Sequence, residues 1–248
     1  MIVSSTEIQN NFGKYLMLAT KEDIIITRNG MEIARLQSME GDPRATLQES
    51  TLNESADAYH FKGNKATYEE FLELTSNDNV NRYEYIDGEI YLLASPRTNH
   101  QYAVTELIGT FYQTFQGSGC TPFVAPYDIK LKKKNKDDPN VVQPDLMVIC
   151  DLDNHLDERD YYTGVPSLVV EVLSESTQSK DLVTKLQLYM ESGVKEYWIV
   201  NPLNMEITIY HFEDYQIKNT KTYKDKENAH SFIYKDLSVK LGQIFKKS

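Results

Sequence analysis

The chain of 248 residues has little cysteine, no long hydrophobic run and no excess of positive charge. Its two cysteines, Cys120 and Cys150, show neither metal-ligand spacing nor a disulfide framework, which is typical of proteins in a reducing cytosol. Residues 1–5 lack the basic start and apolar core of a signal peptide. No apolar run approaches the roughly 20 residues that span a bilayer. We therefore expect a soluble cytoplasmic protein without a membrane partner.

The charge balance narrows the function classes. A net charge of −11 argues against a protein that coats nucleic acid non-specifically, and the lack of a glycine-rich phosphate loop argues against a nucleotide-driven machine. A nuclease is not excluded, because a metal ion and a local basic patch can supply a positive field at the phosphates. One basic patch is present, and its candidate nucleic-acid contacts are Lys130, Lys132, Lys133 and Lys134. A solvated turn is the alternative, and lysines contact phosphates without reading bases.

The most informative stretch places two carboxylates at neighbouring strands. Short apolar runs at 146–150 and 168–173 predict adjacent strands, with Asp145 at the start of the first and Glu171 inside the second. A buried carboxylate is costly unless it is paired or bound to a metal, and Mg²⁺ prefers oxygen ligands. Lys185 follows on a predicted helix and can reach back towards both acids. Two acids and a lysine suit phosphodiester hydrolysis, while a structural ion pair is the alternative.

Residues 65–218 resemble the Uma-two family of bacterial proteins, which has the restriction-endonuclease-like PD-(D/E)-x-K nuclease fold. The matching segments are 83–89, 99–101, 143–146, 170–174, 181 with 185 and 189, and 193–198. The resemblance implies that Asp145 and Glu171 are the metal-binding acids. The position two after Glu171 holds Leu173 instead of the parent pattern's lysine, so the resemblance points to Lys185, on the next helix.

These observations lead to a mechanism with named residues. Asp145, Glu171 and the backbone carbonyl of Val172 are expected to hold Mg²⁺ or Mn²⁺, and Lys185 to orient the attacking water. Nucleases of this fold often add an acid from early in the domain. Further candidate site residues are Glu89, with Glu84 and Glu106 as alternatives, and His100. The expected function is a metal-dependent nuclease acting on nucleic acid, with DNA favoured. The alternatives are a non-catalytic DNA-binding or regulatory protein on a nuclease scaffold, and a structural protein.

Residues 1–39 predict a small separate α+β module. A strand at 1–4, an amphipathic helix carrying Ile8 and Tyr15, and a hairpin around Asn29-Gly30 follow one another. The patterns at 5–16 and 26–34 resemble the N-terminal domain of Phd/YefM-type antitoxins, which implies a dimerising module that binds operator DNA. The module's charge is nearly balanced, so we favour homodimerisation over autonomous DNA binding. A unit of about forty residues also has a poor core and usually needs a partner chain.

The predicted fold is α/β: a restriction-endonuclease-like mixed central sheet flanked by helices, preceded by the small α+β module. The polar segment 40–64 is expected to be a linker, and 65–248 the nuclease domain. The domain's predicted elements are helices at 67–74 and from an Asn99 cap to Phe115, a hairpin around Asp87-Gly88, one or two strands in 123–131, strands at 195–200, 207–210 and 216–223, and a closing segment 232–245.

Overall fold

The computed structural model of the chain describes residues 1–10, 12–19, 22–28, 31–37, 65–78, 80–174 and 180–245. The chain divides into two compact units, Met1–Ala56 and Asp57–Ser248. The predicted linker 40–64 lies outside the described residues, and so do Asn29 and Gly30 of the first hairpin. No helix in the described ranges is both long enough and apolar enough to cross a bilayer.

The first unit is a three-stranded sheet with two helices. Its elements are β1 (Ile2–Ser4), α1 (Ser5–Asn10), α2 (Phe12–Ala19), β2 (Ile24–Arg28) and β3 (Met31–Leu36). Strand β2 pairs in parallel with β1 and antiparallel with β3. Val3, Ile24 and Ile26 are buried against the helical residues Ile8, Tyr15 and Ala19. Strand, helix and hairpin therefore form where the sequence predicts them.

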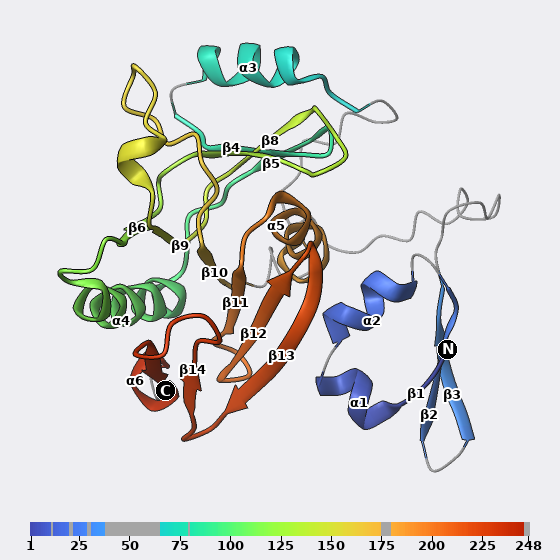
Figure 1. The fold of residues 1–248 in the computed structure, drawn as a ribbon. Coiled ribbons are helices and arrows are strands. Elements are labelled where there is room, and N and C mark those ends of the chain that lie inside the picture. The colour runs from blue at the N-terminus through green and yellow to red at the C-terminus, as the bar shows by residue number, and fades with distance from the viewer. Residues whose placement is uncertain are drawn as a thin grey trace. The chain divides into compact units, whose positions relative to one another are not determined.

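The second unit contains two larger sheets and the helices that cover them (Figure 1). Its elements up to residue 154 are α3 (Tyr68–Asn77), β4 (Tyr83–Ile86), β5 (Glu89–Leu92), α4 (Thr98–Phe115), β6 (Thr121–Val124), β7 (Ile129–Lys132), β8 (Pro139–Val142), β9 (Leu146–Ile149) and a 3₁₀ turn η2 (Leu152–Asn154). The rest are β10 (Leu168–Val172), a π-helix η3 (Lys180–Lys185), α5 (Leu186–Ser192), β11 (Glu196–Asn201), β12 (Glu206–Glu213), β13 (Gln216–Lys224), β14 (Asn228–His230), β15 (Ser238–Lys240) and α6 (Leu241–Ile244).

The larger sheet has the order β13-β12-β11-β10-β9-β6, and the smaller one the order β5-β4-β8-β7. In the larger sheet β10 and β11 are parallel and the other pairs are antiparallel, so the sheet is mixed as predicted. The predicted adjacency of the two apolar runs is confirmed, because β9 and β10 pair directly with Leu146 opposite Val170. Strand β8 was not predicted, since its four residues are too short to show periodicity.

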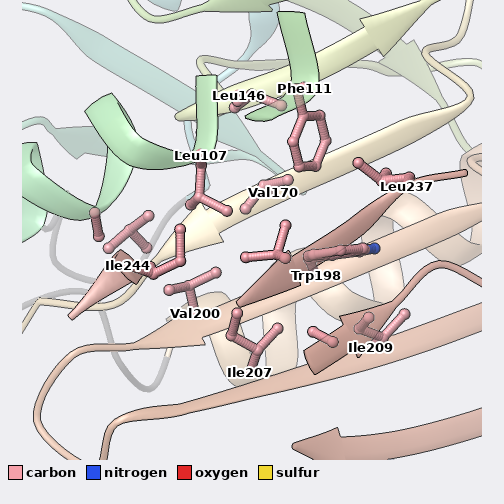
Figure 2. Packing of buried hydrophobic residues seen from close by; sticks show 14 of the residues in the cluster. Leu107, Phe111, Leu146, Val170, Trp198, Val200, Ile207, Ile209, Leu237 and Ile244 are labelled. Atoms are coloured by element: carbon pink, nitrogen blue, oxygen red, sulfur yellow. The ribbon is translucent and has the colours of Figure 1, made fainter. Parts of the chain in front are cut away.

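The main core lies between the larger sheet and helices α4 and α6 (Figure 2). Trp198 of β11 is fully buried there, and Phe111 of α4 meets its ring edge-on at a centroid distance of 5.6 Å. The predicted packing of the closing segment on the sheet is confirmed by its buried residues Leu237, Val239, Leu241 and Ile244. Helix α4 begins at Thr98 with Arg97 at its cap, so the prediction of an Asn99 cap was wrong by two positions.

Side-chain alternation along β10 sorts its residues between the two faces of the sheet. Val170 and Val172 belong to the core beneath α4, so Glu171 between them points to the other face. On that face Tyr189 of α5 packs on Tyr197 of β11 at a centroid distance of 5.0 Å. The apolar pattern of β10 therefore directs its one carboxylate towards α5.

The same argument applies to β4 in the smaller sheet. Tyr83 and Tyr85 are buried against Phe71 of α3, and Glu84 between them points away from that helix. The hairpin that follows turns through Asp87 and Gly88 with φ of 51° and 87°, as the Asp-Gly signal predicts. Glu84 therefore lies on the face of its sheet that α3 leaves uncovered.

Cys120 and Cys150 form a disulfide, so the prediction that these cysteines are not part of a disulfide framework was wrong. Cys120 precedes β6 and Cys150 follows β9, and these strands are antiparallel neighbours with Thr121 opposite Ile149. The cysteines are the next pair in this register. By loop-closure entropy, a bridge across 30 residues stabilises the fold by about 3–4 kcal/mol. The register between two distant strands cannot be read from cysteine spacing.

Candidate nuclease site

The centre of the candidate site is Lys185, at the last position of the π-helix η3. Its ammonium lies 2.7 Å from Glu171 Oε1 and 2.8 Å from Glu84 Oε1. All three side chains are almost completely buried, with 3 %, 4 % and 0 % exposed in the order Lys185, Glu171, Glu84. Short π-helical turns are frequent at functional sites. Lys185 thus joins a carboxylate of the larger sheet to one of the smaller sheet.

Two further donors hold these carboxylates. The Tyr189 hydroxyl, one turn after Lys185, donates to Glu171 Oε1 at 2.6 Å. The backbone N–H of Gln143 donates to Glu84 Oε1 at 3.0 Å. Since i and i+4 residues share one face of a helix, Lys185 and Tyr189 approach Glu171 together. The result is a fixed polar network in which Glu171 and Glu84 keep their orientation.

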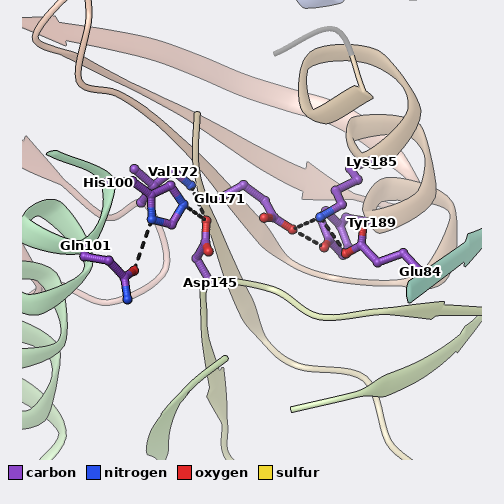
Figure 3. A network of polar contacts seen from close by, with 8 residues as sticks. All are labelled: Glu84, His100, Gln101, Asp145, Glu171, Val172, Lys185 and Tyr189. Atoms are coloured by element: carbon purple, nitrogen blue, oxygen red, sulfur yellow. Dashed lines mark hydrogen bonds and ion pairs between the residues drawn. The ribbon is translucent and has the colours of Figure 1, made fainter. Parts of the chain in front are cut away.

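Asp145 immediately precedes β9 and is next to Glu171 of β10 in the register of the two strands (Figure 3). Its Oδ2 accepts a hydrogen bond from the backbone N–H of Val172 at 2.8 Å and lies 3.1 Å from Nε2 of His100. The Asp145 and His100 side chains are 19 % and 12 % exposed. Asp145 and Glu171 thus lie on adjacent strands, each held by its own set of donors.

These features match those of a known family. A family model described as "Putative restriction endonuclease" matches residues 68–241. The chain belongs to this family, Uma2. The match contains every residue of the polar network and leaves out the first unit. The resemblance of the motifs to this family is therefore confirmed. Nothing in the comparisons supports the antitoxin resemblance of residues 1–39.

Two individual proteins are similar to this Uma2 chain. An uncharacterized protein of Synechocystis sp. is 30 % identical over 151 residues, which cover 60 % of the chain and 76 % of that protein. The crystal structure of a "putative nuclease belonging to DUF820" from Anabaena variabilis superimposes with a TM-score of 0.58 at 16 % identity, covering 72 % of the chain and 97 % of that structure. The latter likeness shows that the second unit shares the fold of that protein.

Of the three acids predicted from early in the domain, only Glu84 contacts Lys185 among the described residues. Among the described residues no contact joins Glu89 to the network: its carboxylate accepts a hydrogen bond from the hydroxyl of Tyr91 at 2.6 Å, and Glu89 is the exposed first residue of β5. Glu84, the alternative to Glu89, is the early acid that contacts Lys185. Glu106 lies within α4, where no contact with Lys185 or Asp145 is seen among the described residues. The signal that favours Glu84 is its place as a lone acid between two strand tyrosines.

Of the four lysines predicted to contact nucleic acid, the structure buries Lys133 and leaves Lys130, Lys132 and Lys134 exposed, and contact with nucleic acid stays a prediction. Lys133 is 3 % exposed, and its ammonium pairs with Asp87 at 2.6 Å and Glu191 at 3.8 Å, so it is taken up by the fold and cannot reach a phosphate. Lys130 and Lys134 lie over the rings of Tyr68 and Tyr215 at 4.4 and 4.3 Å. Lys132 is exposed on β7. Alternation on β7 and the turn after it explains why one of the lysines points inward.

The donor set fits a divalent cation, although no three His, Cys, Asp or Glu side chains among the described residues already converge as a metal centre. Mg²⁺ is usually bound through one or two carboxylates, with water and substrate phosphate completing its shell. Asp145 and Glu171 supply two carboxylates. Two residues before Asp145, the side-chain oxygen of Gln143 is buried and has no hydrogen-bond partner among the described residues. An ordered water or a bound ion can satisfy such a buried acceptor.

Proposed function

We propose that the second unit of this Uma2 protein is a divalent-metal-dependent nuclease that hydrolyses phosphodiester bonds, with DNA as its expected substrate. The observation that carries the proposal is the convergence of Glu171, Lys185 and Glu84, with Asp145 next to Glu171 in the register of β9 and β10, within the family match. Asp145, Glu171 and the backbone carbonyl of Val172 are the groups that would hold Mg²⁺ or Mn²⁺. Such an ion lowers the pKa of bound water and stabilises charge on the phosphate oxygens.

The protein's own residues supply orientation and electrostatics. The Lys185 ammonium and the Tyr189 hydroxyl both donate to Glu171 Oε1, so they fix the rotamer in which this carboxylate points towards α5. The Lys185 ammonium is the one positive side chain in the drawn network, apart from the titratable ring of His100 (Figure 3). It is therefore the residue that would orient the attacking water and balance charge as the phosphate enters.

Cleavage of a supercoiled plasmid tests this proposal. We expect the full chain to nick the plasmid with Mg²⁺ or Mn²⁺ and to stop when EDTA is added. Asp145→Asn and Glu171→Gln should each slow nicking at least about a hundredfold, because a metal contributes several kcal/mol and about 1.4 kcal/mol is a tenfold change in rate. The matched control is Asp153→Asn, which changes an exposed acid on η2 and should leave the rate unchanged.

Metal binding without cleavage of single- or double-stranded DNA or RNA would contradict the nuclease proposal. That outcome would favour a non-catalytic nucleic-acid-binding scaffold. One feature of the site supports this second candidate: the Lys185 ammonium already pairs with two buried glutamates, as ammonium groups do in structural ion-pair networks.

The first unit is proposed to dimerise the chain through its uncovered sheet face. Alternation from the buried Val3 places Ile2 on the face opposite the helices, where it is 71 % exposed. On the other edge strand, β3, Met31 and Ile33 are 70 % and 54 % exposed, next to the β-bulge opposite Ile26 and Thr27. Exposed apolar residues on both edge strands of a small unit mark an interaction surface. A second copy of the antitoxin-like module is the occupant that the resemblance of residues 1–39 implies.

Light scattering of the purified protein checks this dimer. We expect twice the chain mass for the intact protein and a single chain mass after removal of residues 1–39 or after Ile33→Glu. The matched control, Thr6→Glu, adds the same charge at an exposed position of α1 and should leave the dimer intact. An unchanged mass after the truncation would refute the proposal.

A further inference from the structure

His100 occupies a defined position in the first turn of α4. Its Nε2 lies 3.1 Å from Asp145 Oδ2, and its Nδ1 lies 3.3 Å from Oε1 of the neighbouring Gln101. The ring is 12 % exposed and stands between the helix and the start of β9 (Figure 3). Both ring nitrogens thus face oxygen atoms, one on the same helix and one at the start of β9.

The two oxygens of Asp145 have different surroundings. Oδ2 receives the backbone N–H of Val172 at 2.8 Å and faces His100 Nε2. No hydrogen bond or ion pair from the described part of the chain reaches Oδ1. Two hydrogen-bond partners on one oxygen fix the plane of a carboxylate, and the second oxygen then has a fixed direction in which to bind a cation.

We propose that His100 is a positioning residue: it donates through Nε2 to Asp145 Oδ2 and so holds Oδ1 in the orientation that binds the divalent ion. This inference rests on the metal-dependent function proposed above. Hydrogen bonds to ligating carboxylates orient them, and loss of such a partner typically weakens metal affinity 10–100-fold. The Val172 N–H alone would leave the carboxylate free to rotate about a single hydrogen bond.

A purely structural role for His100 predicts a different result. Helix α4 is anchored to the sheet by Ala103, Leu107 and Phe111, which are fully buried, and by Phe115, which is almost fully buried. The first turn therefore does not depend on the His100 contact for its place. Loss of the ring's hydrogen bond should cost only about 1 kcal/mol of stability, whereas the fold-change in metal affinity should be large.

Calorimetric titration of Mn²⁺ into the metal-stripped full chain tests the inference. We expect the dissociation constant to rise 10–100-fold in His100→Phe, which keeps the ring but has no donor. In His100→Gln, whose amide can donate from a similar position, it should stay within about threefold of the wild type. The matched control is His155→Phe, because His155 also faces an aspartate, Asp151, at 3.3 Å but on the exposed segment after β9. That variant should bind Mn²⁺ as the wild type does.

The outcomes separate this inference from the proposed function. Equal Mn²⁺ affinity in His100→Phe and the wild type overturns the positioning role, even if the wild type cleaves DNA. The same holds if His100→Gln and His100→Phe are equally weak and both lose thermal stability. Mn²⁺ binding that depends on His100, in a chain that cleaves no nucleic acid, upholds the inference and overturns the nuclease proposal. A wild-type chain that binds no Mn²⁺ overturns both.

Discussion

Replacing Lys185 with methionine is expected to lower the melting temperature of the second unit by about 6–20 °C and to abolish cleavage. The ammonium is the shared partner of Glu84 and Glu171, which are 0 % and 4 % exposed. Removing one partner of a buried ion pair costs about 3–5 kcal/mol, because the remaining charge is buried without compensation. For a domain of this size each kcal/mol shifts the melting temperature by about 2–4 °C. Differential scanning calorimetry measures the change.

Two further variants show whether the loss comes from the uncompensated carboxylates. Glu84→Gln combined with Lys185→Met should recover at least about 1 kcal/mol relative to Lys185→Met alone, since one buried charge disappears with its partner. Lys235→Met changes an exposed lysine and should leave the melting temperature within about 2 °C of the wild type. If Lys185→Met melts like the wild type, the glutamates do not depend on the ammonium and the described network is not the stable state.

The local parts of the site follow from the sequence. The apolar run of β10 with one acid in it predicts a strand whose carboxylate is directed away from the core, and Glu171 lies there. The i, i+4 spacing of Lys185 and Tyr189 predicts one helical face, and both residues contact Glu171. In each case the period of the element decides which residues lie together. The predicted reach of Lys185 to Glu171 is confirmed as a contact, while its catalytic role stays a prediction.

The contacts between sheets do not follow from the sequence. Glu84 meets Lys185 across about a hundred positions of chain, and the choice between it and Glu89 depends on the packing of the smaller sheet. The Cys120–Cys150 bridge depends on the register of β6 against β9. The inward turn of Lys133 depends on the presence of Asp87 and Glu191 beside it. All three are set by non-local pairing, for which periodicity carries no signal.

Replacing Glu196 with alanine is expected to destabilise the second unit by about 3–9 kcal/mol, without changing any residue of the candidate site. Glu196 is fully buried at the start of β11. Its carboxylate accepts the indole N–H of Trp198 at 2.6 Å and the backbone N–H groups of Phe232 and Ile233 at 2.6 and 3.2 Å. The substitution leaves these three N–H donors without an acceptor, and each buried unsatisfied group costs about 1–3 kcal/mol. Urea unfolding, followed by the fluorescence of the single tryptophan, measures the loss.

The pH dependence of stability gives an independent check on this carboxylate. Burial raises the pKa of Glu196 above its usual value, although its hydrogen bonds with Trp198, Ser231 and the backbone at 232 and 233 lower it. A carboxyl group whose pKa is higher in the folded state binds its proton more readily there. Its contribution to the free energy of unfolding is therefore largest below the unfolded pKa and falls as pH rises through the folded one. Glu196→Gln cannot ionise and should lose this part of the slope.

The matched control for both Glu196 variants is Glu213→Ala on the same sheet. Glu213 pairs with Lys218 at the exposed end of β12, where solvent screens the ion pair and its contribution to stability is small. We expect little change in the free energy of unfolding. A comparably small loss in Glu196→Ala would mean that water replaces the carboxylate as the acceptor of the three N–H groups, and the segment around Phe232 would then not depend on Glu196 for its attachment to β11.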